Sequence, residues 1–306
     1  MTLSLFHTTM RETRRIEKVK DKTGADRWIG VLLIVVSAAS FGALPIFTRL
    51  VYRAGADPTT LLMLRFSIAS VVMVAIMAVR RTPFPRGRIL LVLVLMGGMG
   101  YVGQSLAYFT ALTMVSAGLV ALLLYLYPAI VTVLSVLFFK ERLTVAKTGA
   151  LVLALVGTAF TLGPTGSGRM LGIILAIASA VMSSVYIIVG SRIISYASAI
   201  AASAVVMISA AVVFAGIVAV RGPVFPHTPL SWMFIFAIAL VSTVLPIVTF
   251  LAGLERVGPT RASTISTFEP IVSVVLATVI LGETFSLLQV LGGMLILAAM
   301  MVCNAT

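Results

Sequence analysis

Long apolar stretches, separated by short clusters of charged, glycine and proline residues, make up nearly all of the chain after residue 27. Each stretch is close to the roughly 20 residues that an α-helix needs to span a bilayer. The stretches are continuously apolar rather than alternating, which argues against a transmembrane β-barrel. The pattern predicts ten transmembrane helices, at about residues 29–50, 58–79, 89–111, 117–139, 144–163, 170–190, 198–220, 231–252, 261–281 and 286–303.

Two stretches of the chain repeat one another at an offset of 142 residues, which pairs Pro128 with Pro270 and Glu141 with Glu283. The alternative is chance convergence of two apolar segments on a proline and a terminal acid. Because five predicted spans separate the copies, the second half must cross the membrane in the opposite direction to the first. This inverted repeat is typical of secondary transporters, whose substrate site lies near the midplane between the halves. We therefore predict an all-α membrane protein with a 5+5 inverted repeat, formed by a basic tail (1–27), a first half (28–165) and a second half (166–306).

Composition and charge agree with this class. The chain has 60% apolar and 10% charged residues and a mean hydropathy of +1.18, values that suit a protein dissolved in lipid. Of the 22 lysines and arginines, 17 fall in segments that would share one side of the membrane. Basic residues in short loops stay in the cytoplasm, so both termini are predicted to be cytoplasmic. The net charge of +13 is therefore a topology signal, and no nucleic-acid partner is expected. The basic tail either guides insertion or contacts anionic lipid.

Residues that support enzyme chemistry are scarce. Cys303 is the only cysteine, and the two histidines, His7 and His227, lie outside the predicted spans. No metal site, catalytic triad or phosphate-binding glycine loop can be assembled from them. The sequence predicts neither an enzyme nor a metal or organic cofactor. A glycine run at residues 97–100 lies inside an apolar span, where close helix packing is its natural interpretation.

Polar side chains recur at helical spacing in several spans, and a polar face on a membrane helix points at protein or water. For each serine or threonine, the alternative is a small residue that allows close helix packing. The residues predicted to line a central cavity are Tyr101, Gln104, Tyr108, Tyr127, Ser183, Tyr186, Ser242, Thr249, Ser266 and Glu269. The prolines predicted to bend helices are Pro45, Pro128, Pro246 and Pro270.

Arg65 and Glu269 are ionisable residues deep within predicted spans. Each costs on the order of 2.5 to 3.5 kcal/mol to insert unless it is paired or hydrated, and that cost indicates a purpose. Estimated from helix rise, their heights in the membrane permit a direct pair. Glu269 is predicted either to bind a proton or a substrate ammonium, or to act as a hydrogen-bonded strut that holds the bend at Pro270.

The sequence also resembles a known family, the ten-helix EamA-type members of the drug/metabolite transporter superfamily. The resemblance covers nearly everything after the tail. It rests on Ser-Phe-Gly-Ala-Leu-Pro at 40–45, Leu-Arg-Phe at 64–66, Tyr-Pro at 127, Glu-Pro at 269, Lys-Glu-Arg at 140 and Gly-Glu-Thr at 282. It implies that helices 1–4 and 6–9 enclose a central cavity, with helices 5 and 10 packed outside. The repeat is blurred there, because Gly149 in the first copy corresponds to Leu291 rather than Gly292 in the second.

The family exports amino acids, other metabolites or drugs, and its amino-acid exporters, including the aromatic branch, offer the nearest functional analogy. A cavity with tyrosines, hydroxyls, one amide and few charges suits a zwitterionic amino acid better than a polyanion. The predicted function is export of amino acids across the bacterial inner (plasma) membrane by alternating access, as a monomer or homodimer whose partners are its solute and the bilayer. A multidrug or other metabolite exporter of the same fold, or a channel or facilitator, is the alternative.

Overall fold

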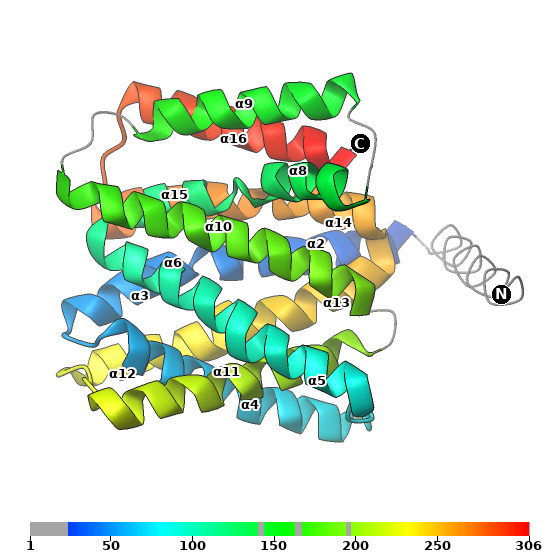
Figure 1. The fold of residues 1–306 in the computed structure, drawn as a ribbon, viewed down its shortest axis with the longest axis vertical. Helices are drawn as coiled ribbons and strands as arrows, with labels where there is room; N and C mark the ends of the chain where they lie inside the picture. Colours follow the sequence, from blue (N-terminus) through cyan, green and yellow to red (C-terminus); the bar gives the residue numbers. More distant parts are fainter. Residues whose placement is uncertain (1–23, 140–143, 163–166, 194–196, 306) are drawn as a thin grey trace, which may run out of the picture.

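In the computed structural model, residues 24–139, 144–162, 167–193 and 197–305 are described, and all their regular structure is helical. The helices lie side by side, and α2 begins and α16 ends at the same end of the bundle (Figure 1). In chain order they are α2 (Gly24–Gly42), α3 (Leu44–Arg53), α4 (Pro58–Val79), α5 (Gly87–Leu95), η1 (Met96–Tyr101), α6 (Val102–Met114), α7 (Ala117–Leu124), α8 (Tyr127–Phe139), α9 (Val145–Leu162), α10 (Ser167–Ile193), α11 (Ala199–Arg221), α12 (Pro229–Ala239), η2 (Leu240–Val244), α13 (Leu245–Val257), α14 (Pro259–Ser266), α15 (Phe268–Leu281) and α16 (Leu287–Ala305).

Several of these helices are long and apolar enough to cross a membrane. Seven helical stretches within the described ranges meet that standard, and three shorter apolar helices cover 145–161, 268–281 and 287–302. Together they fall on the ten windows predicted from hydropathy. Tail residues 1–23 and Glu141, which marks the first copy of the repeat, lie outside the described residues.

Helix interruptions recur at related positions in the two halves. The π-helical turns η1 and η2 interrupt the third and eighth windows, and breaks at 125–126 and at 267 interrupt the fourth and ninth. Each of the four predicted bend prolines lies within the first three residues of the helix that follows an interruption, at the start of α3, α8, α13 and α15. Proline costs little there, because the first N–H groups of a helix have no partner within it.

Helix packing joins the two halves of the chain. The main neighbours are α2 with α13, α4 with α11, α6 with α10 and α9 with α16, and each pair combines one helix from 28–165 with one from 166–306. A shift of 142 residues converts the α2–α13 pair into the α10–α6 pair, so the packing repeats as the sequence does. The α9–α16 pair forms one edge of the bundle, and α4 and α11 lie near the opposite edge (Figure 1).

Glu283 provides a polar contact between the halves. Its two carboxylate oxygens accept the backbone N–H groups of Ala117 at 2.7 Å and Gly118 at 3.0 Å, in the first turn of α7. These N–H groups have no partner inside the helix, and a carboxylate at a helix N-terminus is stabilised by the helix dipole. Glu283, identified in the sequence as a marker of the repeat, therefore ties the segment after α15 to the start of α7.

Two glycines allow α9 and α16 to approach closely. A Cβ atom at Gly157 would lie 2.7 Å from the Gly292 carbonyl oxygen, and one at Gly292 would lie 2.5 Å from the Gly157 carbonyl oxygen. These distances are shorter than a carbon atom tolerates, so only glycine fits at either position. Gly292 therefore packs against a helix of its own chain.

Gly157→Ala is expected to destabilise the protein by about 1–3 kcal/mol, the usual cost of overpacking a close contact. The added methyl would also meet the Ile296 nitrogen at 2.9 Å, so backbone rather than a flexible side chain must move. Thermal unfolding in detergent, followed by intrinsic fluorescence, measures the effect. Gly149→Ala on the same helix is the matched control, because nothing lies within 4 Å of its added methyl. Equal melting temperatures for the two variants would refute the close contact.

Candidate central cavity

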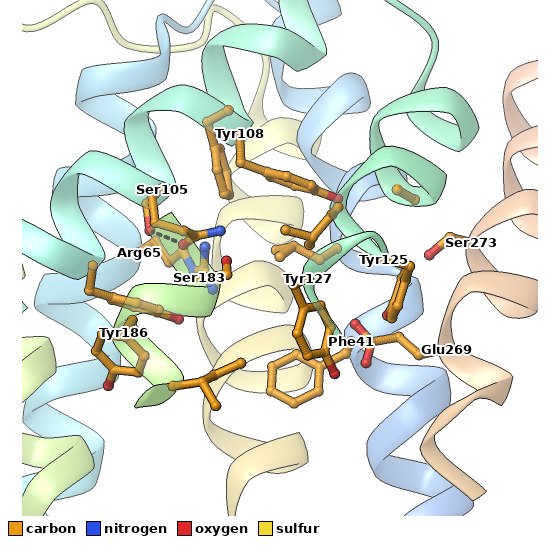
Figure 2. A pocket seen from close by; sticks show the side chains of 17 residues that line it. Phe41, Arg65, Ser105, Tyr108, Tyr125, Tyr127, Ser183, Tyr186, Glu269 and Ser273 are labelled. Carbon is orange, nitrogen blue, oxygen red and sulfur yellow. Dashed lines mark hydrogen bonds between the residues drawn. The ribbon is translucent and has the colours of Figure 1, made fainter. Parts of the chain in front are cut away.

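A cavity of about 230 Å³ lies in the middle of the bundle, between α2, α3, α4, α6, α7, α8, α10 and α15 (Figure 2). Of the side chains singled out from the sequence, it is lined by Arg65, Tyr101, Gln104, Tyr108, Tyr127, Ser183, Tyr186 and Glu269. The other lining residues are Phe41, Leu44, Ser105, Phe109, Ala121, Leu124, Tyr125, Ile187 and Ser273. The polar stripes of the third and sixth windows therefore converge on one space.

Three of the predicted cavity residues lie elsewhere. The Ser266 hydroxyl donates to the Ala262 carbonyl at 2.9 Å, and the Thr249 hydroxyl donates to the Leu245 carbonyl at 2.9 Å. Each is satisfied by its own helix, as the close-packing alternative for serine and threonine allowed. Ser242 is fully buried in η2, and its hydroxyl has no hydrogen-bond partner among the described residues.

The π-helical turn η1 contains both a close packing contact and a residue of the cavity wall. A Cβ at Gly97 would lie 2.5 Å from the Val206 carbonyl oxygen of α11, so Gly97 packs on a neighbouring helix. Tyr101, at the end of the same turn, lines the cavity. A π-helical turn contains an extra residue and so shifts the register of the side chains that follow it. Gly97 thus serves the close packing that the sequence predicted for the glycine run, whereas a Cβ at Gly98 or Gly100 would meet its nearest neighbour at 3.5 or 3.7 Å, an ordinary contact.

Arg65 is held in a fixed orientation on the cavity wall. Only 3% of the residue is exposed, and its Nε donates to the Thr243 hydroxyl at 2.8 Å. Thr243 in turn donates to the Ile238 carbonyl at 2.7 Å, five residues back along the widened turn of η2. The guanidinium carbon lies 5.0 Å from the centre of the Phe66 ring and 5.2 Å from that of Phe109. These ring contacts stabilise the cation without neutralising it.

Glu269 lies on another part of the wall, at the second residue of α15 (Figure 2). Its carboxyl forms no ion pair with Arg65 or another cation in the described part of the chain. The Tyr125 hydroxyl points toward this carboxyl and interacts with it, although the two groups lie outside the geometry of a strict hydrogen bond. Tyr125 is therefore the candidate partner for the proposed strut at Pro270, and the carboxyl, which lines the cavity, also has access to a ligand.

Aromatic rings and one amide complete the wall. Tyr101 and Tyr186 lie with ring centres 5.5 Å apart, and Tyr101 and Phe66 form a T-shaped pair with ring centres 5.4 Å apart. The Gln104 side chain is fixed on both sides, because its Nε2 donates to Ser179 at 3.1 Å and its Oε1 accepts from Ser105 at 3.3 Å. The cavity thus combines a cation, a carboxyl and a large aromatic surface.

Tyr125 was not identified from the sequence. In a continuous helix, Tyr125 and Tyr127 would point in nearly opposite directions, because successive residues rotate by 100°. The break between α7 and α8 removes that constraint, and both rings line the cavity, with centres 6.1 Å apart. The feature of the sequence that could have identified Tyr125 is its place in the run Tyr-Leu-Tyr-Pro at 125–128, next to the predicted cavity residue Tyr127.

Comparison with known proteins accounts for the fold. The sequence profile of the EamA-like transporter family matches residues 28–163 and again 170–305. The chain belongs to the EamA-like transporter family. It is therefore a multi-pass membrane protein of a transporter family. The two matches to the EamA-like profile begin 142 residues apart (170 − 28), the same offset as the sequence repeat.

Individual relatives of this EamA-like transporter agree with that assignment. An uncharacterized transporter of Bacillus subtilis (strain 168), YcbK, is 27% identical over 276 residues, which cover 86% of this chain and 88% of the relative. An uncharacterized transporter of Archaeoglobus fulgidus is 27% identical over 275 residues, covering 89% and 95%. One solved crystal structure aligns with 92% of this chain over 96% of its own chain, with a TM-score of 0.62 and 22% sequence identity. At that identity, the likeness shows the fold alone. None of these names gives a substrate.

Proposed function

We propose that this EamA-like transporter exports zwitterionic amino acids with apolar side chains across the plasma membrane, by alternating exposure of the central cavity. In this proposal the two halves form an inverted repeat of five spans each, with both termini in the cytoplasm, and the transporter works as a monomer or homodimer. The observation that carries the substrate class is that Arg65 and Glu269 line one cavity without pairing with each other.

The argument rests on the cost of burying charge. A charged side chain within a membrane span costs about 2.5 to 3.5 kcal/mol unless a partner or water compensates it. A solute with both a carboxylate and an ammonium group compensates both side chains at once, the carboxylate at Arg65 and the ammonium at Glu269. Charge-assisted hydrogen bonds of this kind are about twice as strong as neutral ones.

The remaining wall suits an apolar side chain on the solute. Tyr101, Tyr186 and the phenylalanines beside Arg65 offer ring surfaces against which an aliphatic or aromatic group can pack. The cavity of about 230 Å³ is smaller than the roughly 300–1,000 Å³ typical of sites for drug-sized ligands. Both properties favour a small amphipathic solute.

A multidrug exporter is the second candidate. Six of the lining residues, Phe41, Leu44, Phe109, Ala121, Leu124 and Ile187, are apolar. Together with the Glu269 carboxyl, such a surface could accept a hydrophobic amine that has no carboxylate. The two candidates differ in whether Arg65 has a partner on the solute.

The test is uptake by liposomes that contain the purified protein, with labelled phenylalanine, 2-phenylethylamine and 3-phenylpropionate as solutes, with and without a pH gradient. The three share a phenyl group and differ only in their charged groups. Saturable uptake of phenylalanine, with weaker uptake of both analogues, is the expected result. Equal or better uptake of the amine would favour the multidrug exporter. If folded protein carried none of the three solutes above the level of empty liposomes, the amino-acid proposal would fail.

A further inference from the structure

A second cavity, of about 410 Å³, lies beside the α3–α4 connection and is lined by Arg49, Tyr52, Arg53, Ala56 and Thr113. We call it the outer cavity, because this end of the bundle faces outward in the proposed orientation. Its residues come from the last turns of α3 and α6 and from the connection between α3 and α4. The same two helices supply Leu44 and Phe109 to the central cavity.

Tyr52 and Phe109 separate the two cavities. Tyr52 lines the outer cavity, and its hydroxyl donates to the Phe109 carbonyl at 3.0 Å. The Phe109 ring lines the central cavity beside the Arg65 guanidinium. One turn further along α6, the Leu112 carbonyl accepts a hydrogen bond from Arg49 Nη1 at 2.7 Å. Two side-chain hydrogen bonds therefore fasten α3 to α6 where a solute would have to pass.

The repeat provides an internal comparison for this closure. Pro45, near the start of α3, is buried, whereas Ile187, the residue 142 positions later on α10, is 39% exposed. Val51, further out on α3, is fully buried, and α3 packs on α6. The outer part of α3 is thus packed against its neighbours, and Pro45 is more buried than its repeat equivalent Ile187.

The outer cavity also carries an unusual concentration of positive charge. Arg49 and Arg53 are four residues apart on α3, so they lie on one face of the helix. Like charges at this spacing repel each other, and basic residues are disfavoured on the outer side of a membrane. The neighbouring carboxyl of Asp57 accepts the N–H groups of Thr59 and Thr60. Arg53 makes no hydrogen bond or ion pair within the described ranges, so its guanidinium remains available to a ligand.

We propose that the outer cavity is a second binding site for the solute, in which Arg49 and Arg53 hold its carboxylate, and that Tyr52 and Phe109 form the gate between this site and the central cavity. The carboxylate then has a guanidinium on each side of the gate: Arg65 within and Arg53 beyond it. When the gate opens, the bond from Arg49 to Leu112 breaks with it, and the freed guanidinium joins Arg53. The carboxylate assignment rests on the proposed function, whereas the gate does not.

The gate is tested by cysteine labelling, which needs no transported solute. The full-length protein with Cys303→Ser and Ser105→Cys carries one thiol, on the wall of the central cavity. A membrane-impermeant thiol reagent is applied to right-side-out and to inside-out vesicles. Tyr52→Phe removes one hydrogen bond of the gate and is expected to raise the labelling rate from the outer side about fivefold.

Tyr186→Phe is the matched control, because it also removes one tyrosine hydroxyl, on the wall of the central cavity that carries the thiol but away from the gate. It is expected to leave the outer labelling rate unchanged. Equal rates for Tyr52→Phe and its parent would overturn the gate, as would an equal rise in the Tyr186→Phe control. A rise from the inner side alone would overturn its assignment to the outer end.

The charge of the outer cavity is tested with a cysteine at Thr113. In the Cys303→Ser, Thr113→Cys protein, a sulfonate-bearing reagent is expected to label faster than a trimethylammonium-bearing one of the same reactivity. Arg53→Gln is expected to reduce that preference about fivefold, because one nearby charge is lost. Arg221→Gln, which removes another exposed arginine at the same end of the bundle, is the control and should have no effect. No change in Arg53→Gln would overturn the anion site.

Binding of the solute carboxylate in the outer cavity is tested separately, by protection of the Thr113→Cys thiol from labelling. Phenylalanine and 3-phenylpropionate are expected to slow labelling at Thr113→Cys, whereas 2-phenylethylamine is not. An anionic preference without such protection would overturn the assignment of solute carboxylate to this site. If the protein carried no phenylalanine but Tyr52→Phe still raised labelling at Ser105→Cys, the amino-acid proposal would fail and the gate would stand.

Discussion

Arg65→Gln is expected to raise the KM for phenylalanine transport roughly 10- to 150-fold, which corresponds to the loss of a hydrogen-bonded charge worth about 1.5–3 kcal/mol. Thr243 and the rings of Phe66 and Phe109 fix the guanidinium in place. Arg65 is also the only cation among the described residues that line the central cavity, so no other cation can replace it there. The measurement is initial uptake against phenylalanine concentration in liposomes. 2-Phenylethylamine, which has no carboxylate, should lose far less.

The analogues separate binding from structure. If Arg65 mainly supports the fold, phenylalanine and the amine lose transport in equal proportion, and the thermal stability of the variant falls with them. Thr243→Val is the companion variant, because it keeps the guanidinium but removes its anchor. It should raise the KM only a few-fold, in line with one neutral hydrogen bond of about 1 kcal/mol. Unchanged phenylalanine kinetics in Arg65→Gln would contradict the substrate assignment.

Glu269→Gln is expected to produce the complementary loss, an increase of roughly tenfold or more in the KM for phenylalanine with little change for 3-phenylpropionate. The substitution keeps the size of the side chain and removes its negative charge, so the ammonium of the solute loses its partner. Because no described cation pairs with the carboxyl, and the glutamine amide oxygen can still face Tyr125, the change should alter thermal stability little. Equal losses for both solutes would indicate a structural role instead.

The same variant separates a proton from a substrate role for Glu269. If the carboxyl carries a coupled proton, the stimulation of uptake by a pH gradient disappears in Glu269→Gln. If it binds only the ammonium, the KM rises and the response to the gradient persists. Tyr125→Phe is a companion variant, because it removes the hydroxyl that interacts with the carboxyl and keeps the carboxyl itself. It should raise the KM only a few-fold, in line with one hydrogen bond of about 1 kcal/mol, and leave the response to the gradient in place.

Hydropathy predicted the helices well, because a continuously apolar segment in lipid must satisfy its backbone hydrogen bonds within itself. Helical spacing also predicted that Gln104 and Tyr186 would reach one cavity, since each lies within a regular α-helix, α6 and α10 respectively, on a polar stripe. It failed for Ser266 and Thr249, because a hydroxyl can be satisfied by the preceding turn and then needs no polar surroundings.

Other parts of the site depend on backbone irregularities that side-chain spacing does not reveal. Thr243 reaches Arg65 from the π-helical turn η2, whose extra residue follows no simple sequence rule. Tyr125 joins Tyr127 on the wall because the helix breaks between them. The sequence does not indicate the outer cavity, because Arg49 and Arg53 resemble ordinary charges that flank a loop. The cavity exists only because α3 packs against α6.

Because each main helix pair combines one helix from each half of the chain, the protein passes through an incomplete assembly while it is being synthesised. Since α2, α4, α6 and α9 find their main partners in residues that the ribosome has yet to synthesise, the helices up to α9 enter the bilayer with these packing surfaces unmatched. Until α10 to α16 follow, Arg65 lacks its Thr243 anchor and the start of α7 lacks the Glu283 carboxylate. Nascent chains of this protein must therefore wait in lipid, or beside the insertion machinery, as an incomplete assembly, and a truncation after residue 165 should be cleared by membrane proteases rather than accumulate.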